Sequence, residues 1–366
     1  MRIVYVLLSP TFGMHQYTAD LANRMAGQGH DTVLVTATTF ARDRYSPAVQ
    51  VITPITTHNT GFSFEGLRGD RYRQVTKSIR SLDPDVVHIT GVHAWNVPLV
   101  RWLRKQGIPV VHTLHDLDPH LGVGYSSLIK VWNRAIIRSV DHLLVHGQIY
   151  ARRLIAGGCD AGRVSYLPLL HLFLSFEGFA SLGIVEVDYG NWGLFFGRLE
   201  RYKGVAQLID AERMLPMREI GVNLIVAGSG GLDTEAPHTA TVEIRNHRID
   251  DAEAIDLFSR CGVVILPYLD ASQSALIASA YYFGKPVIVT DVGALGEYVQ
   301  HGVTGWVVPA GDARALADAW QAALSDGGRL QQMGEAGRGW YHEQRGLEQA
   351  SLNAMYLGLG KAEGLL

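Results

Sequence analysis

Short apolar runs recur along the whole chain and are separated by longer amphipathic stretches. The runs carry few polar positions and end at Gly, Pro, Ser, Thr or Asp, which is typical of strands that a parallel sheet buries on both faces. The strands predicted in the first half are RIVYVLL (2–8), TVLVTA (32–37), DVVHIT (85–90), PVVHTL (109–114) and HLLVHG (142–147). Those predicted in the second half are WGLFFG (192–197), NLIVAG (223–228), GVVILPY (262–268), PVIVTD (286–291) and GWVVPA (305–310).

Helical patterns lie between these strands. In residues 15–30, Tyr17, Leu21 and Met25 recur at a spacing of four, and Gly29 marks the end of the predicted helix. Strands that alternate with helices predict βαβ units and a doubly wound α/β sheet. Because the alternation starts again in the second half, the sequence predicts two such Rossmann-like domains that face a central cleft.

The two halves share a turn signature that supports this division. GIPVVHT (107–113) and GKPVIVT (284–290) both place Gly-x-Pro before an apolar strand, where Gly ends a helix and Pro prevents its continuation. We predict an N-terminal domain over 1–170, a C-terminal domain over 186–344, and a final helix over 345–366 that packs back on the first domain.

Composition narrows the class of protein. The 47% of hydrophobic residues in 366 suits two globular domains, and two cysteines favour a reducing, cytoplasmic setting. The first apolar run is too short for a leader, and the apolar stretch 167–185 is interrupted by His171 and Glu177, so we predict a buried linker and no membrane span.

The net charge of −3 argues against binding of nucleic acid, yet residues 1–168 carry 18 Lys and Arg against 11 Asp and Glu. That half is predicted to meet an anionic partner.

Two strand ends carry candidate anion-binding groups. In GRLERYKG, Arg198 and Lys203 follow a strand in the turn to the next helix, which suits a diphosphate; the alternative is a solvated loop. In SPTFGMHQY, Gly13 stands where backbone can approach a ligand, but no complete G-x-G-x-x-G is present, so a plain tight turn is the alternative.

A third strand end carries His115, in VVHTLHD, which suits substrate binding or acid–base work; the alternative is a histidine satisfied by local hydrogen bonds. His112 and His115 have no third ligand at a diagnostic spacing. Of the two Asp-x-Asp motifs, 83–85 enters a strand at the end away from ligands, and 116–118 is interpreted as coincidental. The sequence therefore predicts no metal site and no cofactor.

Taken together, these segments resemble retaining GT-B glycosyltransferases of family 4. The resemblance rests on GMHQYTADLANRMAGQGHDTVLVT, TLHD, GRLERYKG, LIVAGSG and GKPVIVTDVGALGEYVQHGVTGWVVPAGD, in this order over nearly the whole chain. It implies a nucleotide-sugar donor held by the C-terminal domain, an acceptor site on the N-terminal domain, and no obligatory metal.

The resemblance also implies roles for single residues. Gly13 and Met14 match the glycine loop near the donor phosphates, and His115 matches the histidine that contacts the transferred sugar. Arg198 and Lys203 match the pair that clamps the diphosphate and stabilises the departing charge. Backbone around Arg248, in RNHRIDD, matches the segment that faces the nucleobase.

One stretch departs from the family pattern. Members usually place two glutamates before the Gly-x-Pro turn with seven residues between them, and in this chain Ala271 and Ser279 occupy those positions. We predict that the donor is held instead by the helix start at Ser272, Gln273, Ser274 and Ala275, with Ser279 standing in at the ribose position.

Two basic segments bear on partners and location. One helical pattern carries Arg68, Arg71, Arg73, Lys77 and Arg80, and VRWLRKQG (100–107) adds further cations beside Trp102. Such faces suit an anionic membrane surface and a lipid-linked acceptor, which predicts peripheral contact with the inner face of a membrane. The alternative is two solvated helix faces.

The sequence thus predicts a cytoplasmic, metal-independent, retaining hexosyltransferase that uses a nucleoside-diphosphate sugar. Its acceptor is a hydroxyl group of a glycan, a lipid-linked glycan or a small molecule. Two alternatives remain open: a nucleotide-sugar epimerase with this fold, and a non-catalytic sugar-nucleotide-binding subunit, which the missing glutamates make credible.

Overall fold

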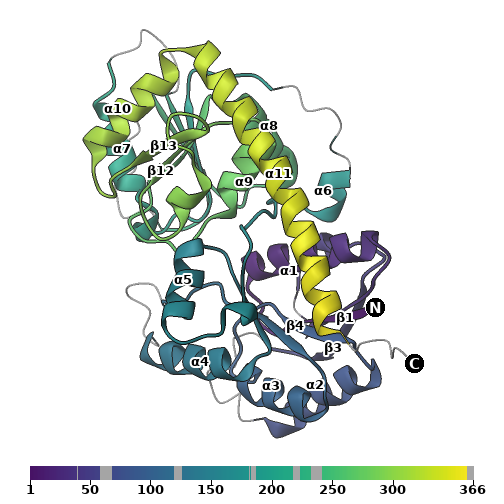
Figure 1. Ribbon diagram of the computed structural model, residues 1–366. Coiled ribbons are helices and arrows are strands. Elements are labelled where there is room, and N and C mark those ends of the chain that lie inside the picture. Colours follow the sequence, from purple (N-terminus) through teal and green to yellow (C-terminus); the bar gives the residue numbers. More distant parts are fainter. Residues whose placement is uncertain are drawn as a thin grey trace. The chain divides into compact units, whose positions relative to one another are not determined.

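The structure is a computed structural model of the chain. It describes residues 1–38, 40–57, 68–118, 126–180, 182, 187–216, 223–231 and 241–360. The chain forms two compact units. The first comprises Met1–Ala180 with Leu347–Leu366, and the second comprises Ser181–Gly346. Each unit is built around one parallel sheet with helices on its faces (Figure 1).

Within the described residues, the first unit holds a seven-stranded sheet in the order β3-β2-β1-β4-β5-β6-β7, and the second a six-stranded sheet in the order β10-β9-β8-β11-β12-β13. The direction of winding reverses between β1 and β4 and between β8 and β11. Sheets of this kind bind ligands beyond the carboxyl ends of the strands at such a reversal. The predicted pair of doubly wound α/β sheets is therefore confirmed.

The bounds of the strands and helices follow. The strands of the first sheet are β1 (Arg2–Leu7), β2 (Asp31–Ala37), β3 (Gln50–Ile55), β4 (Val86–Ile89), β5 (Val110–Thr113), β6 (His142–Val145) and β7 (Val164–Tyr166). Those of the second sheet are β8 (Gly193–Phe196), β9 (Leu224–Gly228), β10 (Val242–Asn246), β11 (Val263–Leu266), β12 (Val287–Thr290) and β13 (Gly305–Val308). The α-helices are α1 (Phe12–Gly27), α2 (Gly69–Ser81), α3 (Asn96–Lys105), α4 (Ser126–Ser139), α5 (Gln148–Ala156), α6 (Phe176–Ala180), α7 (Val205–Arg213), α8 (Asp251–Arg260), α9 (Ala275–Tyr282), α10 (Ala313–Leu324) and α11 (Gly327–Leu359).

The core of the first unit follows the predicted periodicity. Ile3 to Leu7 of β1 are fully buried, as expected for a central strand with helices on both faces. On α1, Tyr17, Leu21 and Met25 are all buried, which confirms the helical face read from the sequence. The helix begins earlier than predicted, at Phe12, so the predicted glycine loop is instead its first turn.

The end of α11 belongs to the first unit. Glu348, Leu352 and Tyr356 recur at a spacing of four and are all buried there. Arg24 on α1 forms ion pairs of 3.2 Å with both Asp20 and Glu348. A buried carboxylate is tolerated because this guanidinium compensates its charge.

A chain of buried hydroxyl and imidazole groups also links α11 to the sheet. Tyr356 Oη lies 3.3 Å from Tyr5 Oη and 2.6 Å from His88 Nδ1. His88 Nε2 lies 2.7 Å from Thr113 Oγ1, which in turn lies 3.0 Å from Tyr17 Oη. Because every member has a partner, these polar groups can be buried without an unsatisfied hydrogen bond.

The two Gly-x-Pro turns have the predicted conformation. Gly107 follows α3 with a φ of 72° and Gly284 follows α9 with a φ of 65°, the left-handed region that favours glycine at a helix end. Pro109 and Pro286 then lead directly into β5 and β12. The same local chemistry therefore ends a helix and starts a strand in both units.

The predicted buried linker over 167–185 is confirmed only in its first part. Residues 167–174 are buried within the first unit, whereas 175–180 are half-buried or exposed, and 181 and 183–186 lie outside the described residues. Within the described ranges, no helix combines the length and the low charge that crossing a bilayer requires.

Candidate functional site

The loops that follow β8 and β11 lie on the two sides of the reversal in the second sheet. Leu269 N donates to Tyr202 O at 2.8 Å, which ties the two loops together. Gly228, at the end of β9, has no room for a side chain, because a Cβ there would stand 1.7 Å from Gly197 O. Backbone contacts therefore hold the turn from which Arg198 and Lys203 project.

Lys203 ends a short 3-10 turn over Arg201–Lys203 and lies over aromatic rings. Its Nζ is 3.6 Å from the ring centroid of Tyr268 and 5.1 Å from that of Tyr202. The Oη of Tyr268 is 3.4 Å from Ser274 Oγ. Because Tyr268 contacts Ser274, the Lys203 ammonium lies beside the loop that opens α9. The Tyr268 ring also limits the positions of this ammonium, since a cation is attracted to the face of an aromatic ring.

Arg198 precedes this 3-10 turn by three residues, and its side chain is 70% exposed. Its Nη1 donates to Glu200 Oε1 at 2.7 Å and its Nη2 donates to Tyr202 Oη at 3.1 Å. A Cβ placed on Gly197 would lie 3.6 Å from Leu276 Cδ1, so Arg198 starts next to the first turn of α9. The structure thus brings the two predicted cations and this helix start together.

Gly204→Ala is expected to disrupt this turn. Gly204 has a φ of 70°, and a Cβ on it would stand 1.8 Å from Pro267 O. Gly107→Ala is the matched control, because Gly107 has a φ of 72° but open space around its Cβ position. We expect the control to cost roughly 1–2 kcal/mol of stability for its backbone strain alone, and Gly204→Ala to cost roughly 1–3 kcal/mol more because it also overpacks. Thermal melting measures both; equal losses would contradict the steric argument.

The start of α9 presents neutral groups. Ser274 is the N-cap, and its Oγ accepts from Leu276 N at 3.4 Å. Ser272 O accepts from Ala294 N at 2.9 Å, so the loop after β12 braces this segment. Gln273 Oε1 is a buried acceptor without a hydrogen-bond partner in the described parts of the chain. Ala275 opens the helix, where backbone N–H groups and the helix dipole favour an anion.

Ser279, which is predicted to stand in at the ribose position, lies inside α9. It is 1% exposed, and its Oγ donates to Ala275 O at 3.2 Å within α9. The hydroxyl proton is therefore used inside the helix, and only the oxygen lone pairs remain for a ligand. The hydroxyls of a ribose need hydrogen-bond partners that they can reach. The geometry therefore supports donor binding by the helix start more than ribose binding by Ser279.

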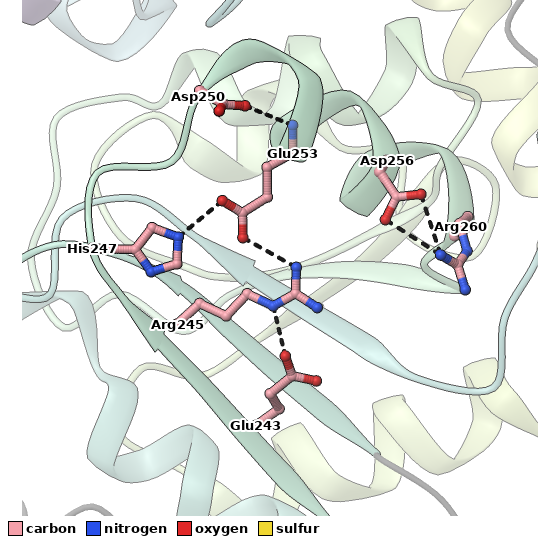
Figure 2. A network of polar contacts seen from close by, with 7 residues as sticks. All are labelled: Glu243, Arg245, His247, Asp250, Glu253, Asp256 and Arg260. Atoms are coloured by element: carbon pink, nitrogen blue, oxygen red, sulfur yellow. Dashed lines mark hydrogen bonds and ion pairs between the residues drawn. The ribbon is translucent and has the colours of Figure 1, made fainter.

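Arg248 stands beyond the carboxyl end of β10, at the edge of the second sheet and separated from β8 by β9. A polar network holds the loop around it (Figure 2): Glu253 accepts from Arg245 Nη1 at 3.1 Å and lies 2.9 Å from His247 Nε2. Asp250 caps α8 by accepting from Glu253 N at 2.9 Å. The loop is thus fixed on both sides of Arg248, which is itself exposed.

In the first unit, the start of α1 lies at the reversal between β1 and β4. A Cβ on Gly13 would meet no atom within 4 Å, so the absence of a side chain leaves open space there. Met14 O accepts from Thr18 Oγ1 at 2.7 Å, and this hydroxyl lies 2.7 Å from Thr90 Oγ1 at the end of β4. Hydrogen bonds therefore connect Met14 to the neighbouring strand end.

His115 joins the same cluster from the end of β5. Its Nε2 lies 3.0 Å from Thr90 O, and the edge of the Tyr17 ring packs on it at 4.9 Å between centroids. A carbonyl only accepts, so Nε2 carries the proton and Nδ1 of the neutral ring keeps its lone pair. Burial lowers the pKa of His115, although nearby Asp116 opposes the shift. A neutral imidazole with a free Nδ1 lone pair can accept a hydrogen bond from a hydroxyl.

The two Asp-x-Asp motifs are engaged elsewhere. Asp85 accepts from Arg2 N at 2.6 Å at the amino end of β4, and Asp118 forms a 2.6 Å ion pair with Arg153. In the part of the chain that the structure describes, no three His, Cys, Asp or Glu side chains converge as a metal site would require.

Comparison with known protein families matches both units. A model described as "Glycosyl transferase 4-like domain" matches residues 12–169, and one described as "Glycosyl transferases group 1" matches residues 189–340. The chain is a glycosyltransferase of the GT-B fold. The matches cover the α1 start, His115, the Arg198–Lys203 turn and α9, so the candidate groups in both units of this glycosyltransferase lie within family regions.

The individual relatives share limited sequence identity with this chain. The glycosyltransferase is 26% identical over 361 residues to D-inositol 3-phosphate glycosyltransferase of Pseudarthrobacter chlorophenolicus, covering 88% of this chain and 84% of the relative. Among solved structures, sucrose-phosphate synthase from Thermosynechococcus elongatus superposes with a TM-score of 0.76 at 21% identity, over 98% of this chain and 99% of that one. Alr3699/HepE of Anabaena in complex with UDP gives 0.71 at 18% identity, over 97% and 99%. These two structures share the fold.

Several residues that contact the candidate groups of this glycosyltransferase were not predicted from the sequence. Tyr268 and Thr90 each come shortly after a buried strand, so the rule that ligands bind at strand ends could have indicated them. Thr18, Glu200 and Tyr202 carried no such signal, because their roles depend on which partner they meet. Each of them contacts a group that the sequence did indicate.

Proposed function

We propose that this glycosyltransferase moves a hexose from a nucleoside-diphosphate sugar to a hydroxyl acceptor, with retention of the anomeric configuration. The observation that carries the proposal is the presence of Arg198 and Lys203 in one loop, between β8 and α7, beside the first turn of α9. Two cations and a helix N-terminus suit the charge of a diphosphate. The UDP named with the Anabaena structure supports the same donor class.

The chemistry follows from these charges. As the bond between the sugar and the diphosphate breaks, negative charge grows on the leaving oxygen, and Arg198 and Lys203 stabilise it. The acceptor proton passes to this oxygen on the face that the leaving group occupies, so no separate base is required. His115 Nδ1 accepts a hydrogen bond from a hydroxyl of the transferred sugar. We propose that the two cations fill the role that a metal has in other sugar transferases.

The acceptor is proposed to be anionic. Residues 1–168 carry 18 Lys and Arg against 11 Asp and Glu, and the relative named for D-inositol 3-phosphate acts on an anionic hydroxyl compound by that name. Arg73, Lys77 and Arg80 are exposed on α2, which would also suit a lipid-linked acceptor at an anionic membrane. Flotation with anionic liposomes at low salt tests that contact, and absence of binding would refute it.

A donor panel tests the function. Thermal melting with UDP-, GDP-, dTDP- and ADP-sugars should single out one nucleotide, because a ligand at a hundredfold its Kd stabilises by about 2.7 kcal/mol. With that donor, release of the nucleoside diphosphate should depend on an acceptor and persist in EDTA, and NMR should show the anomeric configuration of the donor in the product. Conversion of the donor without acceptor would indicate an epimerase, and binding without turnover a non-catalytic subunit.

A further inference from the structure

Arg198 does not stand alone at the proposed diphosphate site. Its Nη1 donates to Glu200 Oε1 at 2.7 Å and its Nη2 donates to Tyr202 Oη at 3.1 Å. Burial raises the pKa of Tyr202, and the nearby Glu200 carboxylate acts in the same direction. Glu200 and Tyr202 therefore accept hydrogen bonds from both terminal nitrogens of the guanidinium.

Glu200 and Tyr202 offer Arg198 two acceptor oxygens, as a phosphate would. A guanidinium binds phosphate through two parallel N–H donors, and here a carboxylate oxygen and a phenol oxygen occupy those donors. Glu200 lies only two residues from Arg198 in the same turn, so the two groups meet at little entropic cost. The two side chains are 70% and 37% exposed, and the pair can therefore open without structural damage.

We propose that Glu200 is an internal competitor for the donor diphosphate and sets the affinity of this site. The inference rests on the proposed function, because it assumes that a diphosphate binds Arg198. Binding then exchanges the carboxylate for phosphate oxygens on Nη1, and the released Glu200 remains near a ligand of the same charge. Both effects weaken donor binding, and they weaken it more for ligands with more phosphate charge.

The test compares Glu200→Gln with the natural chain. Exposed ion pairs are weak, so removal of the charge should lower the Kd for the nucleoside diphosphate that binds by about two- to fivefold. The gain should be smaller for the matching monophosphate and should shrink in about 1 M salt, where surface charges are screened. Asp210→Asn is the matched control, because Asp210 forms a similarly exposed 3.0 Å pair with Arg213 on α7. It changes the net charge equally and should leave the Kd unchanged.

Isothermal titration with UDP, GDP, ADP and dTDP separates the outcomes. Tighter binding in Glu200→Gln alone supports the competitor. Unchanged or weaker binding in Glu200→Gln, while the natural chain binds a nucleoside diphosphate, overturns the inference and leaves the proposed function intact; weaker binding would mean that Glu200 pre-orients Arg198. Equal gains in both variants would assign the effect to net charge and also overturn it. If the natural chain binds none of the four, the proposed function itself fails.

Discussion

Arg198→Ala is expected to lower kcat by about 100- to 1,000-fold, the range seen when one preorganised donor to a developing anion is removed. Lys203→Ala should have an effect of the same order, because its ammonium is held 3.6 Å above the Tyr268 ring, at a defined distance from α9. Both losses should appear mainly in kcat, since the charge that these groups stabilise grows as the leaving group departs. Steady-state kinetics with the donor found in the panel measures them.

Arg201→Ala is the control for these variants. Arg201 lies in the same 3-10 turn and is exposed, so its removal changes the local charge equally without touching the two proposed clamp residues. We expect kcat within about threefold of the natural chain, because a surface charge contributes little. Near-normal turnover in Arg198→Ala and Lys203→Ala, or an equal loss in Arg201→Ala, would refute the clamp. Arg198→Lys should recover only part of the activity, since Lys lacks the planar fork.

Acid should unfold the first unit before the second. Burial lowers the pKa of His15 to about 4 and that of His112 to about 3, and it lowers those of His88 and His146 as well. A histidine whose pKa is lower in the folded state leaves stability intact above about pH 6.5. Below that pH the unfolded chain binds the proton first, and stability falls until the folded pKa is reached. At pH 5 this amounts to about 2 kcal/mol each for His15 and His112, against a total stability of about 5–15 kcal/mol.

Hydrogen exchange at pH 7.5, 6 and 5 resolves this effect by unit. The histidines described in the second unit, His247, His301 and His342, are exposed, so that unit should keep its protection over this range. His112→Gln should lower stability at pH 7.5 but make its fall toward pH 5 shallower, because one titrating group is gone. Equal loss of protection in both units between pH 7.5 and 5 would count against the histidine explanation.

The strands found from the sequence and those missed differ in their place in the sheet. Central strands such as β1 and β11 are buried on both faces, and their unbroken apolar runs made them visible. The missed strands β3, β7 and β10 all lie at sheet edges. Pro54 interrupts β3, β7 has three residues, and β10 alternates apolar residues with Glu243 and Arg245. An edge strand is partly solvated, so its apolar pattern is weaker.

The candidate functional residues were likewise predicted only in part. Arg198, Lys203 and His115 were predicted because charged or titratable residues directly after a buried strand have few structural reasons to be there. Their partners were not predicted: His115 meets Thr90 across 25 positions, and Lys203 meets the ring of Tyr268 across 65. The ribose role of Ser279 stays a prediction, because its hydroxyl donates within α9 and keeps only its oxygen lone pairs for a ligand.

The sequence by itself determined the local elements and the candidate binding residues: alternating buried strands and helices, the Gly-x-Pro turns, and the basic residues after β8. These follow from residue spacing and from backbone preferences, which act over a few positions. Only the tertiary structure decided which strand ends adjoin, and therefore that Lys203 lies over the ring of Tyr268 and that His115 meets Thr90 and presents Nδ1. Those contacts arise from the strand order at each reversal, where residues far apart in the chain are brought within hydrogen-bonding distance.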